Sequence, residues 1–361
     1  MTHISYIIKA LSRLLPVLAA VMLASCDGMI YDEEGDCDPH YKVRFVYDRN
    51  LKYTDAFAAE VDEVTLYIVD TDGTIVWQKH EAGDELKTGS YLMDVEGLTP
   101  GTYSLIAWCG SGYNTDFAIA DDITKHTDLQ VTLGGRTPHE AGWDFAGSAV
   151  RDDFRDLYHG KLMDVTFTDE QGVHIYDVRL TKDTNDVHVV LQHLSGDAVD
   201  DKDFVFTIVE ENGYLDWDNT ILADEPLTYY AHTVTSGSAG VEVPDYKGDG
   251  QGNESRAITA VSCAVADFQV SRITPEKRCM VRIYRKGDKS LVASIPLADY
   301  ALMTKGSHKA LSNEDYLDYR DDYSLVLFLD ENGRWISSQI YINSWHLIFQ
   351  EVGPLAIEPG L

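Results

Sequence analysis

Short apolar, β-branched segments recur along this chain, and each leads into an acidic turn that contains glycine. Four such turns lie at 70–73, 169–172, 210–213 and 330–333. Asp-Gly and Asn-Gly pairs between apolar runs predict hairpins, because a tight turn needs positive φ angles that glycine and asparagine tolerate. Many short hairpins at this spacing favour antiparallel sheets over a parallel α/β sheet. We therefore expect an all-β protein built from β-sandwiches.

The length of 361 residues accommodates two sandwiches, since each could bury its own core. The order strand, turn and aromatic-rich strand recurs near 64–77 and near 204–217. Charged residues interrupt the strand pattern between Arg151 and Gly160. The sequence therefore predicts an N-terminal sandwich at 38–155 and a C-terminal sandwich at 160–352.

Two other segments stand out within the predicted second sandwich. Segment 236–255 is rich in glycine and serine and is expected to be a loop. One short helix is expected from Ser312 to Tyr319, because Ser312 is a favourable N-cap and Asp315 lies three residues later, in the capping-box position.

The N-terminus has the organisation of a bacterial lipoprotein signal peptide. Lys9 and Arg13 precede an apolar run at 14–24 that is too short to span a bilayer as a stable helix. The run ends in Leu-Ala-Ser-Cys, which resembles a lipobox, in which Cys26 takes a diacylglycerol and becomes the mature N-terminus. We expect a signal peptide at 1–25 and lipidation at Cys26. The alternative is an ordinary secretory signal followed by a chance cysteine.

Acidic residues dominate both the segment after Cys26 and the chain as a whole. Residues 26–37 are interpreted as an acidic tether, or as an export signal that sends the lipoprotein to the outer face of the outer membrane. The formal net charge of −31 excludes a nucleic-acid binder that works through a general basic surface, because phosphate contacts need an excess of lysine and arginine.

Four cysteines remain beyond the proposed lipid site, and they leave their pairing open. Cys37, Cys109, Cys263 and Cys279 allow three disulfide pairings, among which the sequence does not choose. An exported chain permits disulfides, so the alternatives are buried thiols or one bridge. Because the chain has no CxxC motif and no Cys/His cluster, a zinc site is not expected.

No set of residues predicts catalysis, a cofactor or a metal site. Asp245, Asp249 and Gly250 imitate a calcium loop, but Lys247 occupies a position that needs a carboxylate. The strand that carries His188 and His193 places the two imidazoles on opposite faces, which makes a poor metal pair. Nucleophile-elbow, HExxH, P-loop and dinucleotide motifs are absent from the sequence. We therefore expect a protein that is not an enzyme.

The six tryptophans have two interpretations. They could form a platform on which sugars stack, or they could pack in the core and between domains. Most lie in alternating strand patterns, which favours packing. They are Trp77, Trp108, Trp143, Trp217, Trp335 and Trp345.

Ordered sequence segments from 41 to 345 resemble the FimB-type fimbrial anchor subunits, the lipoprotein anchors of type V pili. The first segment has Phe45, Tyr47, Asp48 and Asn50, and continues through the run 64–70 to Gly73. Further matching segments are Leu98-Thr99-Pro100-Gly101-Thr102-Tyr103, Ala107-Trp108, Leu157-Tyr158-His159-Gly160, Tyr323-Ser324-Leu325, Phe328-Leu329-Asp330, Ile340-Tyr341-Ile342-Asn343 and Trp345.

The resemblance implies a fold, a location and a partner. It implies two transthyretin-like Greek-key sandwiches, attached to the cell outer membrane through acylated Cys26 and exposed at the base of a fimbrium. It implies that the protein fixes the fimbrium to the membrane and limits its length. The partner is a fimbrial stalk subunit, bound by strand pairing at a sheet edge. We expect the C-terminal strands, 325–347, to be the docking segment, because the N-terminal side is held near the membrane.

A second function class remains open from the sequence. A surface glycan-binding lipoprotein would also be acidic, β-rich and lipid-anchored. It would differ by clustering exposed tryptophan and tyrosine side chains on one face.

Overall fold

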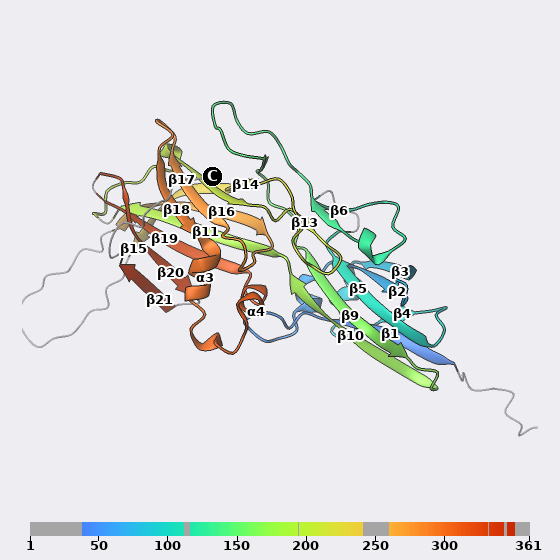
Figure 1. Cartoon of the computed structure of the whole chain (residues 1–361). Coiled ribbons are helices and arrows are strands. Elements are labelled where there is room, and N and C mark those ends of the chain that lie inside the picture. Colours follow the sequence, from blue (N-terminus) through green and yellow to red (C-terminus); the bar gives the residue numbers. More distant parts are fainter. Residues whose placement is uncertain are drawn as a thin grey trace, which may run out of the picture.

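Four β-sheets make up the architecture of the protein. The structure is a computed structural model, and it describes residues 38–111, 116–193, 195–240, 260–330, 332–342 and 345–350. The sheets form two β-sandwiches that lie end to end, with a small sheet beside the point where they meet (Figure 1). The expectation of an all-β sandwich protein is confirmed.

The first sandwich is a sheet of seven strands that changes partners at β10. Its strand order is β3-β2-β5-β9-β10-β1-β4. Residues 172–179 of β10 pair in parallel with β1, whereas Leu180–Lys182 pair antiparallel with β9. Both arms of the sheet contribute side chains to one apolar core. The strands are β1 (Pro39–Val46), β2 (Glu63–Val69), β3 (Ile75–Ala82), β4 (Met93–Val95), β5 (Gly101–Cys109), β9 (Tyr158–Phe167) and β10 (Gly172–Lys182).

The second sandwich packs a sheet of six strands against a sheet of five. Their orders are β15-β16-β11-β19-β20-β21 and β18-β17-β12-β14-β8. The first comprises β11 (Thr184–His193), β15 (Thr233–Gly240), β16 (Ala260–Ser271), β19 (Asp322–Leu329), β20 (Trp335–Ile342) and β21 (Trp345–Gln350). The second comprises β8 (Ser148–Val150), β12 (Phe204–Glu210), β14 (Leu227–Tyr230), β17 (Met280–Arg285) and β18 (Leu291–Pro296).

Short elements complete the described chain. The small sheet contains β6 (Phe117–Ile119), β7 (Val131–Leu133) and β13 (Tyr214–Leu215). In the described part of the chain, no helix has both the length and the apolar character to cross a membrane. The helices are α2 (Phe57–Glu60), α3 (Leu297–Met303) and α4 (Asn313–Asp318), with single 3-10 turns η1 (Asp84–Lys87), η2 (His126–Asp128), η3 (Asp201–Asp203) and η4 (Gly306–His308).

Strand β5 is buried on both faces, which explains its continuous apolar sequence. Leu105 and Ala107 point into the core of the first sandwich. Ile106 and Trp108 belong to a second buried cluster that continues through the small sheet into the second sandwich. The indole of Trp108 donates to the Leu129 carbonyl at 3.2 Å. Apolar packing therefore connects the two sandwiches without a break.

Two of the four expected hairpins close as the sequence predicts. Asp70 Oδ1 accepts hydrogen bonds from the amides of Asp72 and Thr74, and β2 pairs antiparallel with β3. Asp330 Oδ1 accepts from the amides of Asn332 and Arg334 in the same way, between β19 and β20. In both turns an aspartate in the first position satisfies the turn's own amides.

At the other two turns, the two flanking strands do not pair with each other along their full length. At 169–172 the flanking strands diverge, because β9 pairs with β5 and β10 pairs mainly with β1. At 210–213 the first residue is Glu210, and its Oε2 accepts from the amide of Cys279 on a neighbouring segment. Strand β13 then pairs with β7 instead of β12. The hairpin prediction at 210–213 is wrong because longer-range pairing prevails, whereas at 169–172 the flanking strands β9 and β10 do pair antiparallel, but only at their far ends.

The strands also divide between the sandwiches differently from the boundary expected at 155–160. Strands β9 and β10, which cover 158–182, complete the first sandwich, and β8 joins the second. β9 pairs with β5 along its length, and β8 pairs in parallel with β14. The charged segment 151–157 is thus a crossing between sheets. Whether the two sandwiches fold independently stays a prediction.

The short helix expected at 312–319 is confirmed as α4. The hydroxyl of Ser312 accepts from the Asp315 amide at 2.9 Å, which is the predicted N-cap. Tyr316 and Leu317 are buried, so the helix is fixed against the second sandwich.

Gly110 gives a test of how tightly the chain packs where the two sandwiches meet. It has a φ of +90°, and a Cβ there would lie 2.1 Å from the Asp156 carbonyl oxygen. Gly110→Ala should lower the free energy of unfolding by on the order of 3 kcal/mol, through backbone strain and the clash. Gly172→Ala is the matched control, because Gly172 has a φ of +115° with nothing near its Cβ position.

Chemical denaturation of both variants measures the difference. Gly172→Ala should cost about 1 kcal/mol from strain alone. Equal losses in the two variants would contradict the close approach at Gly110.

Candidate functional site

The open edge of the six-stranded sheet is the first candidate site. Strand β21 is the last strand of this sheet, and β20 is its one neighbour in the described part of the chain. Six register pairs, from Ser337↔Gln350 to Ile342↔Trp345, hold β21 to β20. The other side of β21 therefore presents backbone N–H and C=O groups that can pair with an added strand.

The sequence of β21 lacks the features that usually protect an edge. Its residues, Trp-His-Leu-Ile-Phe-Gln, include no Lys, Arg, Asp, Glu, Pro or Gly. The other sheet-end strands longer than three residues do carry such features: β3 has Lys79 and Glu81, β15 has Gly237 and Gly240, and β18 ends in Pro296. Charges, proline and glycine weaken edge pairing. Among the described strands, β21 is the edge best suited to accept a partner strand.

The position of this edge fits a molecule held at its other end. Figure 1 shows β1 beginning at one end of the molecule, in the first sandwich, and β20 and β21 lying at the opposite end. The chain enters the structure at Asp38, immediately before β1. Whatever precedes residue 38 therefore joins the molecule at the end away from the β21 edge.

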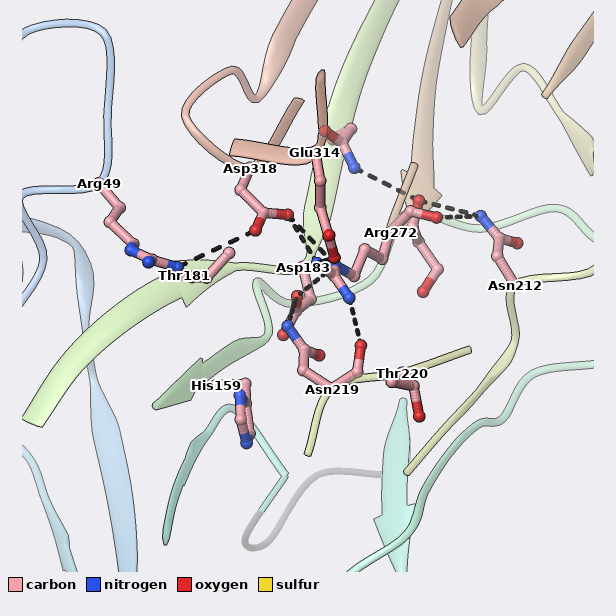
Figure 2. Close-up of polar contacts among 12 residues, drawn as sticks. Arg49, His159, Thr181, Asp183, Asn212, Asn219, Thr220, Arg272, Glu314 and Asp318 are labelled. Carbon is pink, nitrogen blue, oxygen red and sulfur yellow. Dashed lines mark hydrogen bonds and ion pairs between the residues drawn. The ribbon is translucent and has the colours of Figure 1, made fainter. Parts of the chain in front are cut away.

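A buried ionic network forms the second candidate site, where the two sandwiches meet (Figure 2). Arg272 directly follows β16, and its side chain is 7% exposed. Its Nη2 donates to Asp318 Oδ1 at 2.8 Å and to Glu314 Oε1 at 3.2 Å, both on α4. Its Nη1 donates to the carbonyl of Asn219. We call Arg272, Asp183, Asp318, Glu314 and Asn219 the joint network.

Asp183 completes the joint network from the short connection between β10 and β11. Its Oδ1 lies 3.6 Å from Arg272 Nε and accepts from Asn219 Nδ2 at 2.8 Å. Complete burial raises the pKa of the Asp183 carboxyl to about 7, although Arg272 and Asn219 oppose the shift. A buried charge of this kind is tolerated only when it is paired.

Residues of the first sandwich reach the same network. Arg49, in the segment after β1, lies 4.0 Å from Asp318 and donates from Nη1 to Thr181 Oγ1 at 3.1 Å. His159 Nε2 donates to the Trp217 carbonyl at 3.0 Å. Burial lowers the pKa of His159 to about 3, so the imidazole is neutral at physiological pH. The network therefore joins the two sandwiches.

A second ion group supports the same joint from the other side. Lys182 at the end of β10 is 7% exposed, and its Nζ lies 3.0 Å from Asp156 and 3.6 Å from Asp321. The hydroxyl of Tyr47 donates to Asp321 at 3.4 Å. These contacts link β1, β10 and the segment before β19.

The cysteines expected from the sequence fall in different places. Cys26, Cys37 and the whole segment 1–37 lie outside the described residues, so the lipid site stays a prediction. Cys109, Cys263 and Cys279 are free and buried. Burial raises the pKa of the Cys109 and Cys279 thiols well above the ordinary value, so both are protonated.

The other candidate ligands are not brought together. His188 Nδ1 contacts Asp267 Oδ1 at 2.8 Å, whereas His193 Nδ1 contacts the carbonyl of Asp330. Among the residues that the structure describes, no three His, Cys, Asp or Glu side chains gather as a metal site. The calcium-like segment around Asp245 and Asp249 lies outside the described residues.

The tryptophans whose side chains the structure describes do not form one shared platform. Trp108 is fully buried, Trp77 packs against the core of the first sandwich, and Trp217 and Trp335 pack against the second cluster. Trp143 lies instead in the loop between β7 and β8, beside Phe145. The side chain of Trp345 lies outside the described residues. The packing interpretation holds for most of the described tryptophans.

One family model and several solved structures match this chain. The sequence model of the family described as "Fimbrillin-A associated anchor proteins Mfa1 and Mfa2" matches residues 33–351. A candidate adhesin from Bacteroides thetaiotaomicron VPI-5482 has 30% identity and a TM-score of 0.73, and the match covers 88% of this chain and 99% of that chain. No curated protein matches the chain.

Two further solved structures share the fold. A candidate polysaccharide-binding protein from the same Bacteroides strain has 27% identity and a TM-score of 0.68, covering 87% of this chain and 99% of its own. The fimbrial anchor protein Mfa2 from Porphyromonas gingivalis has 14% identity and a TM-score of 0.60, covering 86% and 99%. At this low identity the second likeness shows the fold alone.

Removing Arg272 tests the role of the joint network. Arg272→Ala should lower the free energy of unfolding by about 3–5 kcal/mol at neutral pH, because Asp183 and Asp318 are left buried without their partner. Arg49→Ala is the control, because Arg49 is 38% exposed and meets Asp318 only at 4.0 Å, and it should cost less than about 1 kcal/mol.

The loss of unfolding free energy in Arg272→Ala should depend on pH. Because the folded pKa of Asp183 is about 7 and thus above its unfolded value, the folded state binds a proton there as the pH falls through 7. Protonation removes the unpaired charge, so the loss in Arg272→Ala should be smaller at about pH 5.5 than at about pH 8. Denaturant unfolding at both values measures this, and an equal loss at both would exclude Asp183 as the cause.

Proposed function

The chain belongs to the family of fimbrillin-A associated anchor proteins, and we propose that it is the lipid-anchored subunit that attaches a fimbrium to the outer membrane. The family match extends over 33–351, which includes both sandwiches and the β21 edge. A fimbria-associated role at the cell surface follows from the family. The lipid, the docking edge and the control of length are the parts that we propose.

The lipid is proposed at Cys26. The acidic segment 26–37 separates this lipid site from the first described residue. In extended form, about 12 residues reach on the order of 40 Å, which is enough to hold the first sandwich above the headgroups. The negative charge of this segment disfavours contact with anionic lipid, so the tether is expected to extend away from the membrane.

The docking site is proposed at the free side of β21. The observation that carries this part is the unprotected edge at the end of the molecule opposite to residue 38 (Figure 1). A stalk subunit would add a strand beside β21, with main-chain hydrogen bonds supplying affinity and side-chain pockets supplying specificity. The edge lies within the C-terminal region expected from the sequence.

An anchor with this arrangement would also end the polymer. A chain whose N-terminus carries the lipid cannot release its N-terminal segment to a neighbour without leaving the membrane. Subunits could then be added only at the β21 side. The proposed restriction on fimbrial length follows from this one-sided geometry.

Substitution of the proposed lipid site tests membrane attachment. Cys26→Ala should lose incorporation of a fatty-acid probe and move from the membrane fraction to the soluble fraction, because the acyl chains provide the attachment. Cys37→Ala is the matched control within the same acidic segment and should keep both the label and the membrane location. Retained label in Cys26→Ala would exclude this lipid site.

Introducing charged residues into β21 tests the proposed docking site. Leu347→Lys together with Ile348→Lys places one charge on each face of β21, since successive strand residues point to opposite faces. We expect fimbriae in the culture medium while the protein stays in the outer membrane, because lysines on an edge strand oppose strand addition. The same double substitution at Thr235 and Ser236, on β15 at the opposite edge of the sheet, should leave the fimbriae attached.

Electron microscopy of cells and immunoblotting of the medium give the readout. Fimbriae that remain attached in the β21 variant would place docking elsewhere. Shedding by both variants would indicate a general effect on the sheet.

A further inference from the structure

An aromatic and cationic pocket lies on the outer face of the five-stranded sheet, apart from the β21 edge and the joint network. Its floor comes from three adjacent strands, with Thr228 on β14, Val209 on β12, and Arg282 and Tyr284 on β17. Thr228 and Val209 are register partners, so the floor is continuous across the strands. The loop 138–147, between β7 and β8, covers this floor and leaves a cavity of about 520 Å³. We call this cavity the aromatic pocket.

Three aromatic rings form its walls. Trp143 and Phe145 from the loop are stacked, with ring centroids 5.1 Å apart and planes at 20°. Tyr284 lies 5.1 Å from Phe145 and 5.6 Å from Trp143. Residues of the loop and of β17 thus present one connected aromatic surface to the cavity.

The charges that line the pocket oppose the charge of the whole protein. Lys289 lies 5.5 Å from the centre of the Trp143 ring and donates to the carbonyl of Gly142. Arg282 also lines the cavity, and its guanidinium makes no hydrogen bond or ion pair with any residue that the structure describes. Asp144 is the one acidic lining residue. The pocket is thus lined by two cationic side chains and one carboxylate, whereas the whole chain has a net charge of −31.

A buried hydroxyl at the floor has an unused hydrogen-bonding capacity. Thr228 is completely buried, yet its Oγ1 has no partner among the described residues. Buried hydroxyls in folded proteins are normally hydrogen-bonded. The guanidinium of Arg282, which has no partner among the described residues, is available to a polar ligand in the cavity.

We propose that the aromatic pocket binds an acidic saccharide. The C–H face of a sugar ring packs on aromatic rings such as those of Trp143, Phe145 and Tyr284. A carboxylate on the sugar would accept two parallel hydrogen bonds from the guanidinium of Arg282, which has no partner among the described residues. Lys289 adds a second positive charge. Small-ligand pockets span about 300–1,000 Å³, and this cavity falls within that range.

A ring-shaped ligand fits this place better than a peptide strand. Both β12 and β17 are interior strands of their sheet, with β14 and β18 on their outer sides. Their backbone groups are already paired, so an extended peptide has no edge to join here. The cavity therefore has to recognise its ligand through side chains alone.

Calorimetric titration of the full-length chain tests the proposal with two probes. A tetramer of galacturonic acid should bind at least about tenfold more tightly than the neutral tetramer of galactose, because only the first carries carboxylates. Arg282→Gln should remove this preference, and Trp143→Ala should weaken binding of both probes. Lys286→Gln is the matched control, because Lys286 follows β17 without lining the pocket.

Thermal unfolding of each variant confirms that the fold is kept. Absent binding of the acidic tetramer, equal affinity for both tetramers, or an undiminished preference in Arg282→Gln would each overturn the proposal. A tetraglutamate peptide that binds as tightly as the acidic sugar would overturn it as well, since the site would then recognise charge alone.

Discussion

The burial of one arginine charge holds this molecule in its shape. Arg272 is placed where the two sandwiches meet, and carboxylates from α4 and from the β10–β11 connection surround it. Because each of these charges is costly without the others, the second sandwich, its helix and the end of the first sandwich are fixed together. Apolar packing around Trp108 connects the same parts, but apolar contacts are less directional. We infer that the network, more than apolar burial, sets how the two sandwiches are oriented.

Local sequence signals predicted those parts of the fold that depend on near neighbours. The turns at Asp70 and Asp330 formed because each aspartate accepts its own turn's amides, and α4 formed because Ser312 caps it. The partners of β9, β10 and β8 could not be predicted, because an apolar run shows that a strand is buried but not which strand lies beside it. The boundary at 155–160 was misplaced for this reason.

The same limit explains what was missed in the candidate sites. The C-terminal region that we propose for docking could be singled out from the sequence, whereas the joint network could not. A signal was present, since Arg272 immediately follows a long strand and Asp183 separates two others. Charged residues at strand ends are ordinarily exposed, so the burial of Arg272 and its partners on α4 become visible only in three dimensions. The aromatic pocket likewise combines a loop and strands that are distant in sequence.

The parallel pairing of β1 with β10 has a mechanical consequence if, as we propose, the protein is pulled from both ends. A force on the proposed lipid would reach the fold at the start of β1, and a force on the fimbrium would act at β21 and pass through β20 to β19. β1 is joined to β10 by eight register pairs, and β11, which follows β10 after Asp183, is joined to β19 by eight more. Pulling along these strands loads every hydrogen bond of a pair at once, in shear, instead of opening them one after another. Resistance to detachment under flow is then set by the unfolding rate under load and not by equilibrium stability.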